Sequence, residues 1–537
     1  MPENFNSLYR DLYQNVDLLI GEKTPEEPAV AEFYNSKAAA MMLFTHIIAG
    51  SRIAIHTDVD MDGVGSCYIL KNWLLACRND LSVDCWINKK KQHGIDLGKS
   101  ESFNHLEKKY DLIIILDSST NELEAIKDLD CDVLVIDHHE VNIDLKELTG
   151  FTKGVNTRLD PFDKTSTNAE KPCKYVIINS LVDNLPNFKA SDTMSAGLAT
   201  YEFLRYFQTV FNLPNLLEEK KLYQWAVITL FTDKMNNDNP RNIYYVQKAR
   251  QMIDKEPGLA QMYNSLNCKS SFLSKSDINF SLAPTFNTAI RAGFSKEALD
   301  MALREPNNVG VLKVYKEIQQ EVLLDFDNNI NLQPLYVTKD ITGEGKENYS
   351  GLIAQKLLSK YNRTAIVYTR CVDDKNMVAG SFRGLLENMD YRQLLENWGY
   401  YAQGHKTAFG FRFPVDEVDA IMQRLCTVER QLNTQDYLTA GTISEHGKHH
   451  IYNIKEFQET GNLWKLGILN SIMSSDINIV LSKDDIKLKS VNDKGTYFTY
   501  DFNGVIVNSF EAITTEKAYM YVEHQDRLRI YLRNKYH

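Results

Sequence analysis

Aspartates at alternate positions are the feature of this sequence with the clearest chemical meaning. Between His56 and Gly63 the chain places Asp58, Asp60 and Asp62 at every second residue. Carboxylates this close repel one another, so such a loop is destabilised unless protons or cations neutralise it. The alternatives are a solvated acidic turn and a calcium loop, but a calcium loop needs a later bidentate glutamate that is absent at the matching offset. The segment therefore predicts a divalent-metal site.

Two more polar clusters follow short apolar runs. Asp117 comes directly after the run 112–116, and Asp137, His138 and His139 follow a similar run. Taken alone, the second cluster is equally well a capped strand end with one hydrogen-bonded histidine. Together with the acidic segment it supplies imidazole and several carboxylates, a ligand set that suits manganese. Two ions about 4 Å apart need a bridging carboxylate, for which Asp117 is the candidate.

The elements that must position these residues are strands of a parallel sheet. The runs 52–56, 112–116 and 133–136 are short, rich in β-branched residues and separated by helical patterns such as 65–77. This alternation predicts a parallel sheet covered by helices on both faces. Ligands bind beyond the carboxyl ends of the strands in such sheets. We therefore expect an α/β fold in which three strand ends meet at one edge.

The chain of 537 residues is too long for a single core. The parallel-sheet domain is expected to occupy 1–305, and apolar residues at three- and four-residue spacing predict a linker helix within 306–330. A second, smaller α/β domain is expected at 331–430. Short β-rich runs separated by Asn, Asp and Gly predict a small β-barrel or sandwich in 431–537.

The composition fits an ordinary globular protein, with 43% hydrophobic and 24% charged residues. A net charge of −11 argues against a protein that coats nucleic acid through its overall field, but a local basic channel stays compatible with it. The N-terminus has no signal-peptide pattern, and no stretch reaches the roughly 18 apolar residues of a membrane span. We therefore expect a soluble, cytoplasmic protein. The eight scattered cysteines predict reduced core residues.

Taken in order, the motifs resemble those of the DHH phosphoesterases and, within them, the RecJ-like single-strand-specific exonucleases. The segment 56–63 resembles the family's D-x-D-x-D-G motif, and Asp117 looks like its isolated second-motif aspartate. Residues 137–139 are the eponymous triplet. Asp233, at the end of 228–233, resembles the fourth-motif aspartate.

This resemblance implies a role for each polar residue. One metal ion would be bound by His56, Asp60 and Asp117, and the other by Asp62, Asp117, His138 and Asp233. Asp117 would bridge the two ions. The resemblance also implies that Asp58 and His139 act in catalysis from outside the ligand set, with His139 donating to a phosphate oxygen.

Further segments resemble RecJ motifs that contact substrate. Residues 278–291 are similar to I-x-F-x-x-x-P-x-x-N-A-x-x-R, and 380–383 look like G-S-x-R. Residues 404–411 look like G-G-H-x-x-A-x-G, although Gln403 replaces the first glycine. The alternative is that the segments 380–383 and 404–411 are ordinary surface turns and that Arg291 pairs with a local carboxylate. Arginine binds phosphate bidentately, and glycines let backbone amides approach it, so the expected substrate contacts are Asn287, Arg291, Ser381, Arg383, Gly404 and His405.

The resemblance implies hydrolysis of single-stranded DNA, from 5′ to 3′, with two divalent ions, Mn²⁺ first and Mg²⁺ as the alternative. It also implies a monomer that acts in DNA repair and recombination, with a single-strand-binding protein or a helicase as partner and no membrane. A phosphodiesterase of short oligonucleotides or cyclic dinucleotides is the first alternative, since it shares the two-domain core. A non-catalytic replication scaffold is the second. The β-rich end lies where RecJ-like enzymes carry an oligonucleotide-binding barrel.

Overall fold

The structure is a computed structural model of the chain. It describes residues 14–89, 94–95, 110–156, 171–182, 193–251, 254–268, 270–271, 273–386, 389–433, 438–439, 442–445, 448–451, 460–473, 477–502, 504–524 and 528–534. Within these ranges the chain forms two compact units: Asp17–Lys316 with Ser471–Ser474, and Glu317–Asn470 with Ser475–His537 and the N-terminal residues 14–16. The boundary falls inside the predicted linker, and the division into four domains stays a prediction.

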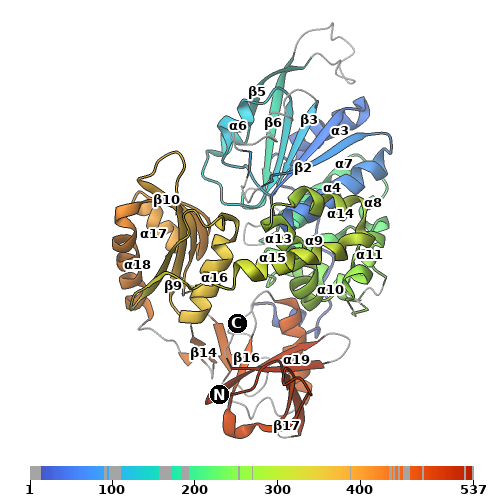
Figure 1. The fold of residues 1–537 in the computed structure, drawn as a ribbon. Helices are drawn as coiled ribbons and strands as arrows, with labels where there is room; N and C mark the ends of the chain where they lie inside the picture. Colours follow the sequence, from blue (N-terminus) through green and yellow to red (C-terminus); the bar gives the residue numbers. More distant parts are fainter. Residues whose placement is uncertain are drawn as a thin grey trace. The chain divides into compact units, whose positions relative to one another are not determined.

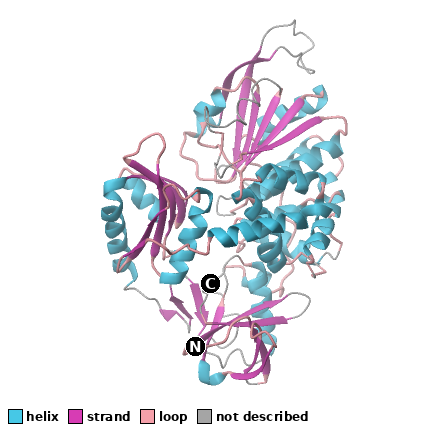
Figure 2. Cartoon of the chain, viewed as in Figure 1, coloured by secondary structure: helices cyan, strands magenta, loops and turns pink. Residues whose placement is uncertain are grey.

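A six-stranded sheet forms the core of the first unit (Figures 1 and 2), built from β1 (Arg52–Thr57), β2 (Ser82–Ile87), β3 (Leu112–Leu116), β4 (Asp132–Asp137), β5 (Thr149–Asn156) and β6 (Lys171–Asn179). The strand order is β2-β1-β3-β4-β6-β5, and every pair is parallel except β5 with β6. β3 is buried at every position, as a central strand covered on both faces must be. The predicted parallel sheet is confirmed, with an antiparallel edge strand added.

Helices cover this sheet. α6 packs on one face, where its Leu123 and Ile126 belong to the same buried apolar cluster as Ile113 and Val133 of the strands. α3, α4 and α7 also pack against strands. No helix among the described residues is both long and apolar enough to cross a bilayer. The helices of this unit are α2 (Val16–Leu19), α3 (Ser36–Ala49), α4 (Met61–Cys77), α6 (Leu123–Lys127), η1 (Leu145–Leu148), α7 (Ala196–Val210), α8 (Leu216–Glu219), α9 (Tyr223–Thr232), α10 (Pro240–Gln251), α11 (Pro257–Leu266), α12 (Lys275–Asp277), η2 (Ile278–Leu282), α13 (Ala283–Arg291) and α14 (Ser295–Arg304).

The linker is helical but is not the single long helix that the apolar spacing suggested. It consists of a 3₁₀ helix, η3 (Pro306–Lys313), followed by the short α15 (Val314–Val322). Val309 and Leu312, three residues apart, are buried, which matches the three-residue period of a 3₁₀ helix. A Cβ at Gly310 would lie 2.7 Å from the Ser265 carbonyl oxygen. Close packing on α11 therefore sets the tighter winding here.

A second six-stranded sheet lies in the second unit, formed by β7 (Ile330–Leu332), β8 (Tyr336–Asp340), β9 (Thr364–Arg370), β10 (Met377–Arg383), β11 (Tyr401–His405) and β12 (Ala408–Pro414). Its order is β11-β12-β10-β9-β8-β7, with β8 and β9 parallel and the other neighbours antiparallel. Adjacent residues Ile366 and Val367 belong to different apolar clusters, so both faces are covered. The accompanying helices are η4 (Glu347–Tyr349), α16 (Ser350–Tyr361), α17 (Tyr391–Asn397), η5 (Val415–Glu417) and α18 (Val418–Asn433).

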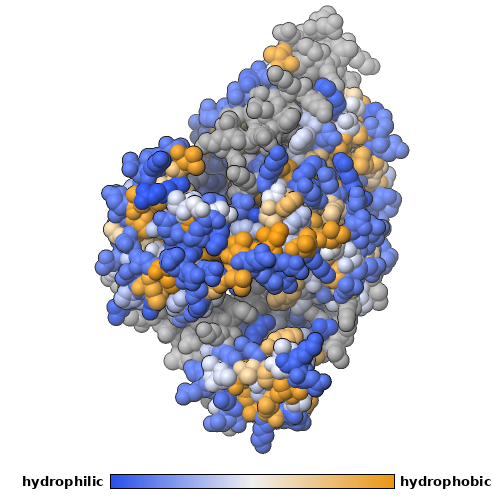
Figure 3. Space-filling model, in the orientation of Figure 1, coloured by the Kyte–Doolittle hydropathy of each residue, from blue (hydrophilic) through white to orange (hydrophobic). Residues whose placement is uncertain are grey.

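The C-terminal part is a curled nine-stranded sheet of order β13-β14-β15-β16-β20-β21-β19-β18-β17, which confirms the predicted β-rich end. Apolar side chains lie among polar ones on the surface of this part (Figure 3), and Leu488, Ile506 and Phe510 are exposed residues of it. Its elements are β13 (Leu438–Thr439), β14 (Thr442–Glu445), β15 (Lys448–Ile451), α19 (Thr460–Ile472), β16 (Asn478–Ser482), η7 (Lys483–Asp485), β17 (Lys487–Val491), β18 (Phe498–Phe502), β19 (Val505–Ser509), β20 (Lys517–His524) and β21 (Leu528–Arg533).

Candidate metal centre

β1 ends in the acidic segment, which folds directly into α4. Asp60 caps the helix, because its Oδ1 accepts hydrogen bonds from the amides of Asp62 at 2.9 Å and Gly63 at 3.1 Å. The Asp58 amide donates to the Leu116 carbonyl at 3.3 Å, so the β1–β3 pairing continues past the strand end. A Cβ at Gly63 would lie 2.5 Å from the Asp58 carbonyl oxygen. Only glycine allows the helix to start this close to the strand.

Asp62 is fixed by the beginning of α7. Its Oδ2 and Oδ1 accept hydrogen bonds from the amides of Ala196 and Gly197, each at 2.9 Å. Amides at a helix N-terminus favour a carboxylate in this position. Burial nevertheless raises the pKa of Asp62 to about 8; His138 opposes this rise and the charge of Asp233 reinforces it. The side chain is therefore held in place, but its charged form is unfavourable in the absence of a cation.

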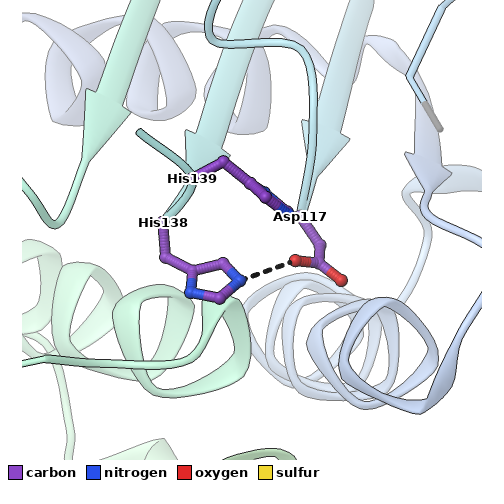
Figure 4. A group of neighbouring side chains, drawn as sticks. All are labelled: Asp117, His138 and His139. Carbon is purple, nitrogen blue, oxygen red and sulfur yellow. Dashed lines mark ion pairs between the residues drawn. The ribbon is translucent and has the colours of Figure 1, made fainter. Parts of the chain in front are cut away.

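Asp117 follows β3 in a left-handed backbone conformation, with φ of 65°. A non-glycine residue there is strained, although aspartate tolerates the region better than most. The turn aims the carboxylate at the end of β4, and Oδ1 of Asp117 lies 3.2 Å from Nε2 of His138. Figure 4 shows both side chains projecting from neighbouring strand ends, with His139 beside them. The strained turn thus directs Asp117 toward the histidines.

Asp137, the last residue of β4, organises the two histidines that follow it. Its Oδ1 accepts hydrogen bonds from the amides of His138 at 2.7 Å and His139 at 3.2 Å, and from His139 Nδ1 at 2.8 Å. Its Oδ2 accepts from the Thr120 amide at 3.1 Å. Asp137 therefore positions the histidines. From the sequence it was only part of a motif, although its place one residue before two histidines was a usable signal.

The Asp137–His139 pair is ionised in the folded protein. Burial alone would raise the pKa of Asp137, but the charge and hydrogen bond of His139 outweigh it and hold that pKa below the usual range. Burial lowers the pKa of the His139 imidazole, but the charge and hydrogen bond of Asp137 outweigh burial and raise this pKa to about 10. His139 is consequently an imidazolium at neutral pH, a cation next to the acidic cluster.

Side chains from four strand or helix ends converge on one centre. Nε2 of His138 lies 3.6 Å from Oδ2 of Asp233, which caps the C-terminus of α9, and 3.7 Å from Oδ2 of Asp62. Among the described residues, potential ligand atoms lie within 4.8 Å of one another in three groups: Asp117, His138 and His139; Asp62, His138 and Asp233; Asp58, Asp60 and Asp117. Asp117 and His138 each belong to two of these groups.

The charges of this cluster favour cation binding. Burial raises the pKa of Asp117 well above its usual value, and the neighbouring carboxylates, first Asp62, raise it further. Burial also raises the pKa of Asp233, to about 7. Burial lowers the pKa of His56 and of His138, so both rings are neutral, as metal-binding histidines must be. Crowded carboxylates with neutral imidazoles are a donor set that fits Mn²⁺ or Mg²⁺.

His56 lies on β1, two residues before Asp58, and is outside the three groups. It is 1% exposed, and its Nε2 lies 3.3 Å from Oδ1 of Asn88. Its Nδ1 is buried and has no hydrogen-bond partner among the residues that the structure describes. Asn88 received no role from the sequence. Asp58 and His139, expected outside the ligand set, do lie in groups with Asp117.

The helices that carry these residues approach closely at glycines. A Cβ at Gly65 of α4 would lie 2.4 Å from Cγ2 of Thr229 in α9, and one at Gly197 of α7 would lie 2.3 Å from Oγ1 of Thr229. Ser195, the N-cap of α7, is hydrogen-bonded to the same Oγ1 at 2.8 Å. Thr229 precedes Asp233 by one helical turn. The starts of α4 and α7 and the end of α9 are thereby held around one centre.

The two expected substrate contacts of the first unit lie on α13. Asn287 and Arg291 are both half-buried there, and neither belongs to a metal group among the described residues. The helix is preceded by a π-helical turn, Ile278–Leu282. Such turns are rare and are frequent at functional sites. A role for Asn287 and Arg291 in binding substrate stays a prediction.

The other expected contacts lie in the second unit, on β10 and β11. Oγ of Ser381 is 2.9 Å from Oγ of Ser350, the first residue of α16. A Cβ on Gly351 would lie 2.8 Å from Nη2 of Arg383, so Ser381 and Arg383 both face the N-terminus of this helix. Gly404 has a φ of 132°. His405 ends β11, but its side chain lies outside what the structure describes. The predicted clamp is untested.

Comparison with known proteins agrees with this geometry. Residues 52–167 match the model of the DHH family, N-terminal domain. The chain is 22% identical over 422 residues to the "Putative SPbeta prophage-derived single-strand DNA-specific exonuclease YorK" of Bacillus subtilis (strain 168), which covers 70% of this chain and 66% of the relative. It is 22% identical over 468 residues to the single-stranded-DNA-specific exonuclease RecJ of Bacillus subtilis (strain 168), covering 82% of this chain and 54% of RecJ.

A solved structure supports the same fold. RecJ from Thermus thermophilus in complex with Mn²⁺ aligns with 99% of this chain and 78% of that chain, with a TM-score of 0.64 and 16% identity; its Mg²⁺ complex aligns with a TM-score of 0.62. Residues 52–167, which contain the site residues from His56 to His139, therefore resemble the N-terminal domain of the DHH family. Over most of its length the chain is similar, at 22% identity, to proteins named as the single-strand DNA-specific exonucleases RecJ and YorK.

Proposed function

We propose that this protein is an exonuclease that hydrolyses the phosphodiester bonds of single-stranded DNA with two divalent metal ions. The observation that carries the proposal is that Asp117 and His138, both buried, each belong to two of the three groups of potential ligand atoms. Two ions on either side of one carboxylate fit such sharing. The relatives, named as single-strand DNA-specific exonucleases, indicate the substrate class. The 5′-to-3′ direction rests on the resemblance to RecJ.

The residues divide into two ligand sets. Asp60 and Asp117, with His56 or Asp58, would hold one ion, and Asp62, Asp117, His138 and Asp233 the other. Mn²⁺ is the first candidate and Mg²⁺ the second, as in the Thermus thermophilus RecJ complexes. Bound ions would supply an activated water and would neutralise charge on the attacking and leaving oxygens.

Two further residues act on the scissile phosphate in this proposal. His139 is cationic and lies next to Asp117 in one of the groups, so it donates a hydrogen bond to a non-bridging oxygen. Asp58, 1% exposed, either orients the attacking water or completes the first ligand set. No covalent nucleophile would be required, because bound ions would activate a water for in-line attack.

Substrate is held by residues away from the ions. Arg383 and Arg291 bind phosphates, since a guanidinium donates to two phosphate oxygens at once. Ser381 and Asn287 add neutral donors, and the glycine at 404 lets a strand approach the backbone next to His405. The protein acts as a monomer in this proposal, and a single-strand-binding protein or a helicase that exposes single strands is the expected partner.

The test is a digestion assay. The protein is incubated with Mn²⁺ and end-labelled single-stranded DNA, duplex DNA, an RNA dinucleotide and a cyclic dinucleotide, and Asp117→Asn serves as the inactive control. We expect stepwise shortening of single-stranded DNA from its 5′ end. Cleavage of the dinucleotides alone would refute the exonuclease and favour the phosphodiesterase alternative. No cleavage, together with no Mn²⁺ binding, would favour the scaffold.

A further inference from the structure

A buried hydrogen-bond relay borders the metal centre beside β1. In the parallel register of β1 with β2, His56 is opposite Trp86 and Thr57 is opposite Ile87. Asn88, the next residue along, is 3% exposed and turns its side chain toward His56. Its Oδ1 lies 3.3 Å from Nε2 of the imidazole. The pairing of β1 with β2 therefore places the Asn88 amide next to His56, an expected metal ligand.

The other end of the Asn88 side chain fixes its orientation. Its Nδ2 donates a hydrogen bond to the Gly94 carbonyl at 2.9 Å. An amide carries hydrogens only on nitrogen, so Oδ1 is the atom that faces His56, and it can only accept. Nε2 of His56 must then carry the proton. A second proton, on Nδ1, would be buried without an acceptor among the described residues, which is costly. The lone pair of the ring is therefore on Nδ1.

The acceptor, Gly94, is itself held in place. The amide of Ile95 donates to Oε2 of Glu122 at 2.7 Å and to Oγ of Ser119 at 3.2 Å, and Ser119 also donates to Glu122 at 2.8 Å. Gly94 has a φ of 73°, and a Cβ there would lie 2.2 Å from Oε1 of Glu122. Ser119 is two residues beyond Asp117. The relay thus joins the end of β2 to the strained turn after β3.

A third contact holds the backbone of Asn88. The hydroxyl of Ser295, the first residue of α14, donates to the Asn88 carbonyl oxygen. Ser295 is 1% exposed, so water does not compete with this bond. Both the main chain and the side chain of Asn88 are consequently fixed by partners from other elements. Such an arrangement suits a residue whose task is to orient a neighbour.

We propose that Asn88 is a positioning residue that holds His56 in its Nε2–H tautomer and leaves Nδ1 as the metal-ligand atom. The inference rests on the proposed two-metal function and selects His56, rather than Asp58, as the residue that joins Asp60 and Asp117 at one ion. A hydrogen bond on the far nitrogen of a metal-binding histidine sets its tautomer and ring orientation. Asparagine satisfies both ends of the relay. Aspartate would keep the acceptor and lose the donor, and leucine, of similar size, would lose both.

The tautomer can be read directly in the metal-free protein by NMR of ¹⁵N-labelled histidines, with His56 assigned by comparison with His56→Gln. We expect the Nε2–H form in the wild type and in Asn88→Asp, and a loss of that preference in Asn88→Leu. Calorimetric titration with Mn²⁺ should show affinity for one ion falling about 10- to 100-fold in Asn88→Leu, and less in Asn88→Asp. Asn72→Leu is the matched control, because the hydrogen bond that Asn72 donates among the described residues stays within α4, to the Tyr68 carbonyl at 2.9 Å.

An Nδ1–H tautomer in the wild type would overturn the inference, and this measurement needs no variant at position 88. Unchanged Mn²⁺ affinity in Asn88→Leu, or an equal loss in Asn72→Leu, would also overturn it. Failure of the wild type to bind Mn²⁺ would instead contradict the proposed function. The two ideas therefore fail on different measurements.

Discussion

At the scale of single residues, Asp117 combines two unfavourable features. Its backbone is in the left-handed region at φ 65°, and its carboxyl group is buried among other carboxylates that raise its pKa. Glycine at this position would relieve the backbone strain, and asparagine would remove the charge, yet aspartate is present. Strain and unfavourable charge gathered in one residue are typical of functional sites, where stability is lost in exchange for chemistry.

Asp117→Asn tests this exchange, since the amide keeps the shape and removes the charge. We expect kcat on single-stranded DNA with Mn²⁺ to fall by about 10³-fold or more. We also expect the metal-free variant to have a higher Tm than the metal-free wild type at pH 8. Asp84→Asn, which alters a carboxylate hydrogen-bonded to Tyr110, is the control. Activity within tenfold of wild type would contradict the bridging role.

The acidic cluster also predicts how metal binding depends on pH. The pKa values of Asp233 and Asp62 in the metal-free fold are about 7 and about 8, so these groups carry protons below those values and Mn²⁺ must displace them. Affinity for Mn²⁺ should therefore rise as the pH increases from 6 to 8. Titration calorimetry in two buffers of different ionisation enthalpy should show proton release. Constant affinity over this range would contradict the assignment.

The same shifts predict a stability effect with a definite sign. A carboxyl group whose folded pKa exceeds its unfolded pKa binds more protons when folded, so its stabilising contribution is complete at low pH and is lost as the pH rises through the folded pKa. The metal-free protein should therefore lose stability from Asp233 and Asp62 between pH 6 and 8. Mn²⁺ should raise Tm more at pH 8 than at pH 6, which thermal unfolding can measure. An increase that shrinks with pH would contradict these pKa shifts.

Part of the residue-scale picture could be read from the sequence. Asp58, Asp60 and Asp62 indicated a cation site through their spacing alone. Asp233 could be found only by resemblance, because no acidic neighbour marks it and a helix brings it to the strand ends. Asn88 could not be found, because its meaning depends on the β1–β2 register and on a hydrogen bond to Gly94.

At the scale of elements, the centre depends on how tightly three helices pack. Gly65 on α4 and Gly197 on α7 both lie against Thr229 on α9. Each helix contributes to the site at one end, so a small increase in their separation would move several ligands at once. Packed interiors transmit such displacements because they contain few voids.

A double-variant cycle measures this packing. The Cβ introduced by Gly65→Ala would lie 2.4 Å from Cγ2 of Thr229, so we expect the variant to lose about 1–3 kcal/mol of unfolding free energy. Thr229→Ser removes that methyl group and keeps the hydroxyl bonded to Ser195. The Gly65→Ala, Thr229→Ser double variant should therefore recover most of the loss in denaturant unfolding. Additive losses in the double variant would show that this contact is not the cause.

Elements with strong local patterns were predictable. The apolar runs 52–56, 112–116 and 133–136 predicted β1, β3 and β4, and the helical pattern at 65–77 predicted most of α4, because regular elements leave a regular hydrophobic pattern. The prediction of the linker was less accurate. Apolar spacing over 308–329 predicted one helix, whereas packing on Ser265 produces a 3₁₀ segment before a short α15.

At the scale of the whole molecule, the metal residues and several expected substrate contacts belong to different compact units. Asp117 lies in the first unit, and Ser381 and Arg383 lie in the second. Catalysis and substrate binding should therefore be separable by mutation. The net charge of −11 makes the few well-placed arginines more important for holding a polyanion.

Arg383→Ala tests that separation. Loss of a charge-assisted hydrogen bond costs about 1.5–3 kcal/mol, so we expect KM for single-stranded DNA to rise about 10- to 100-fold. Mn²⁺ affinity, measured by calorimetry without DNA, should stay at the wild-type value. Arg370→Ala on β9 of the same unit is the control, because its guanidinium is bonded to the Lys375 carbonyl at 3.0 Å. Reduced Mn²⁺ binding by Arg383→Ala would count against a phosphate clamp.

In the proposed function, Asp117 bridges two metal ions at the carboxyl edge of the first sheet. Anomalous diffraction at the manganese edge, from crystals of the full chain grown with Mn²⁺, tests it most directly. We expect two peaks about 4 Å apart, on either side of the Asp117 carboxylate, with Asp62, His138 and Asp233 around one of them. A single peak, or peaks away from Asp117, would contradict the claim.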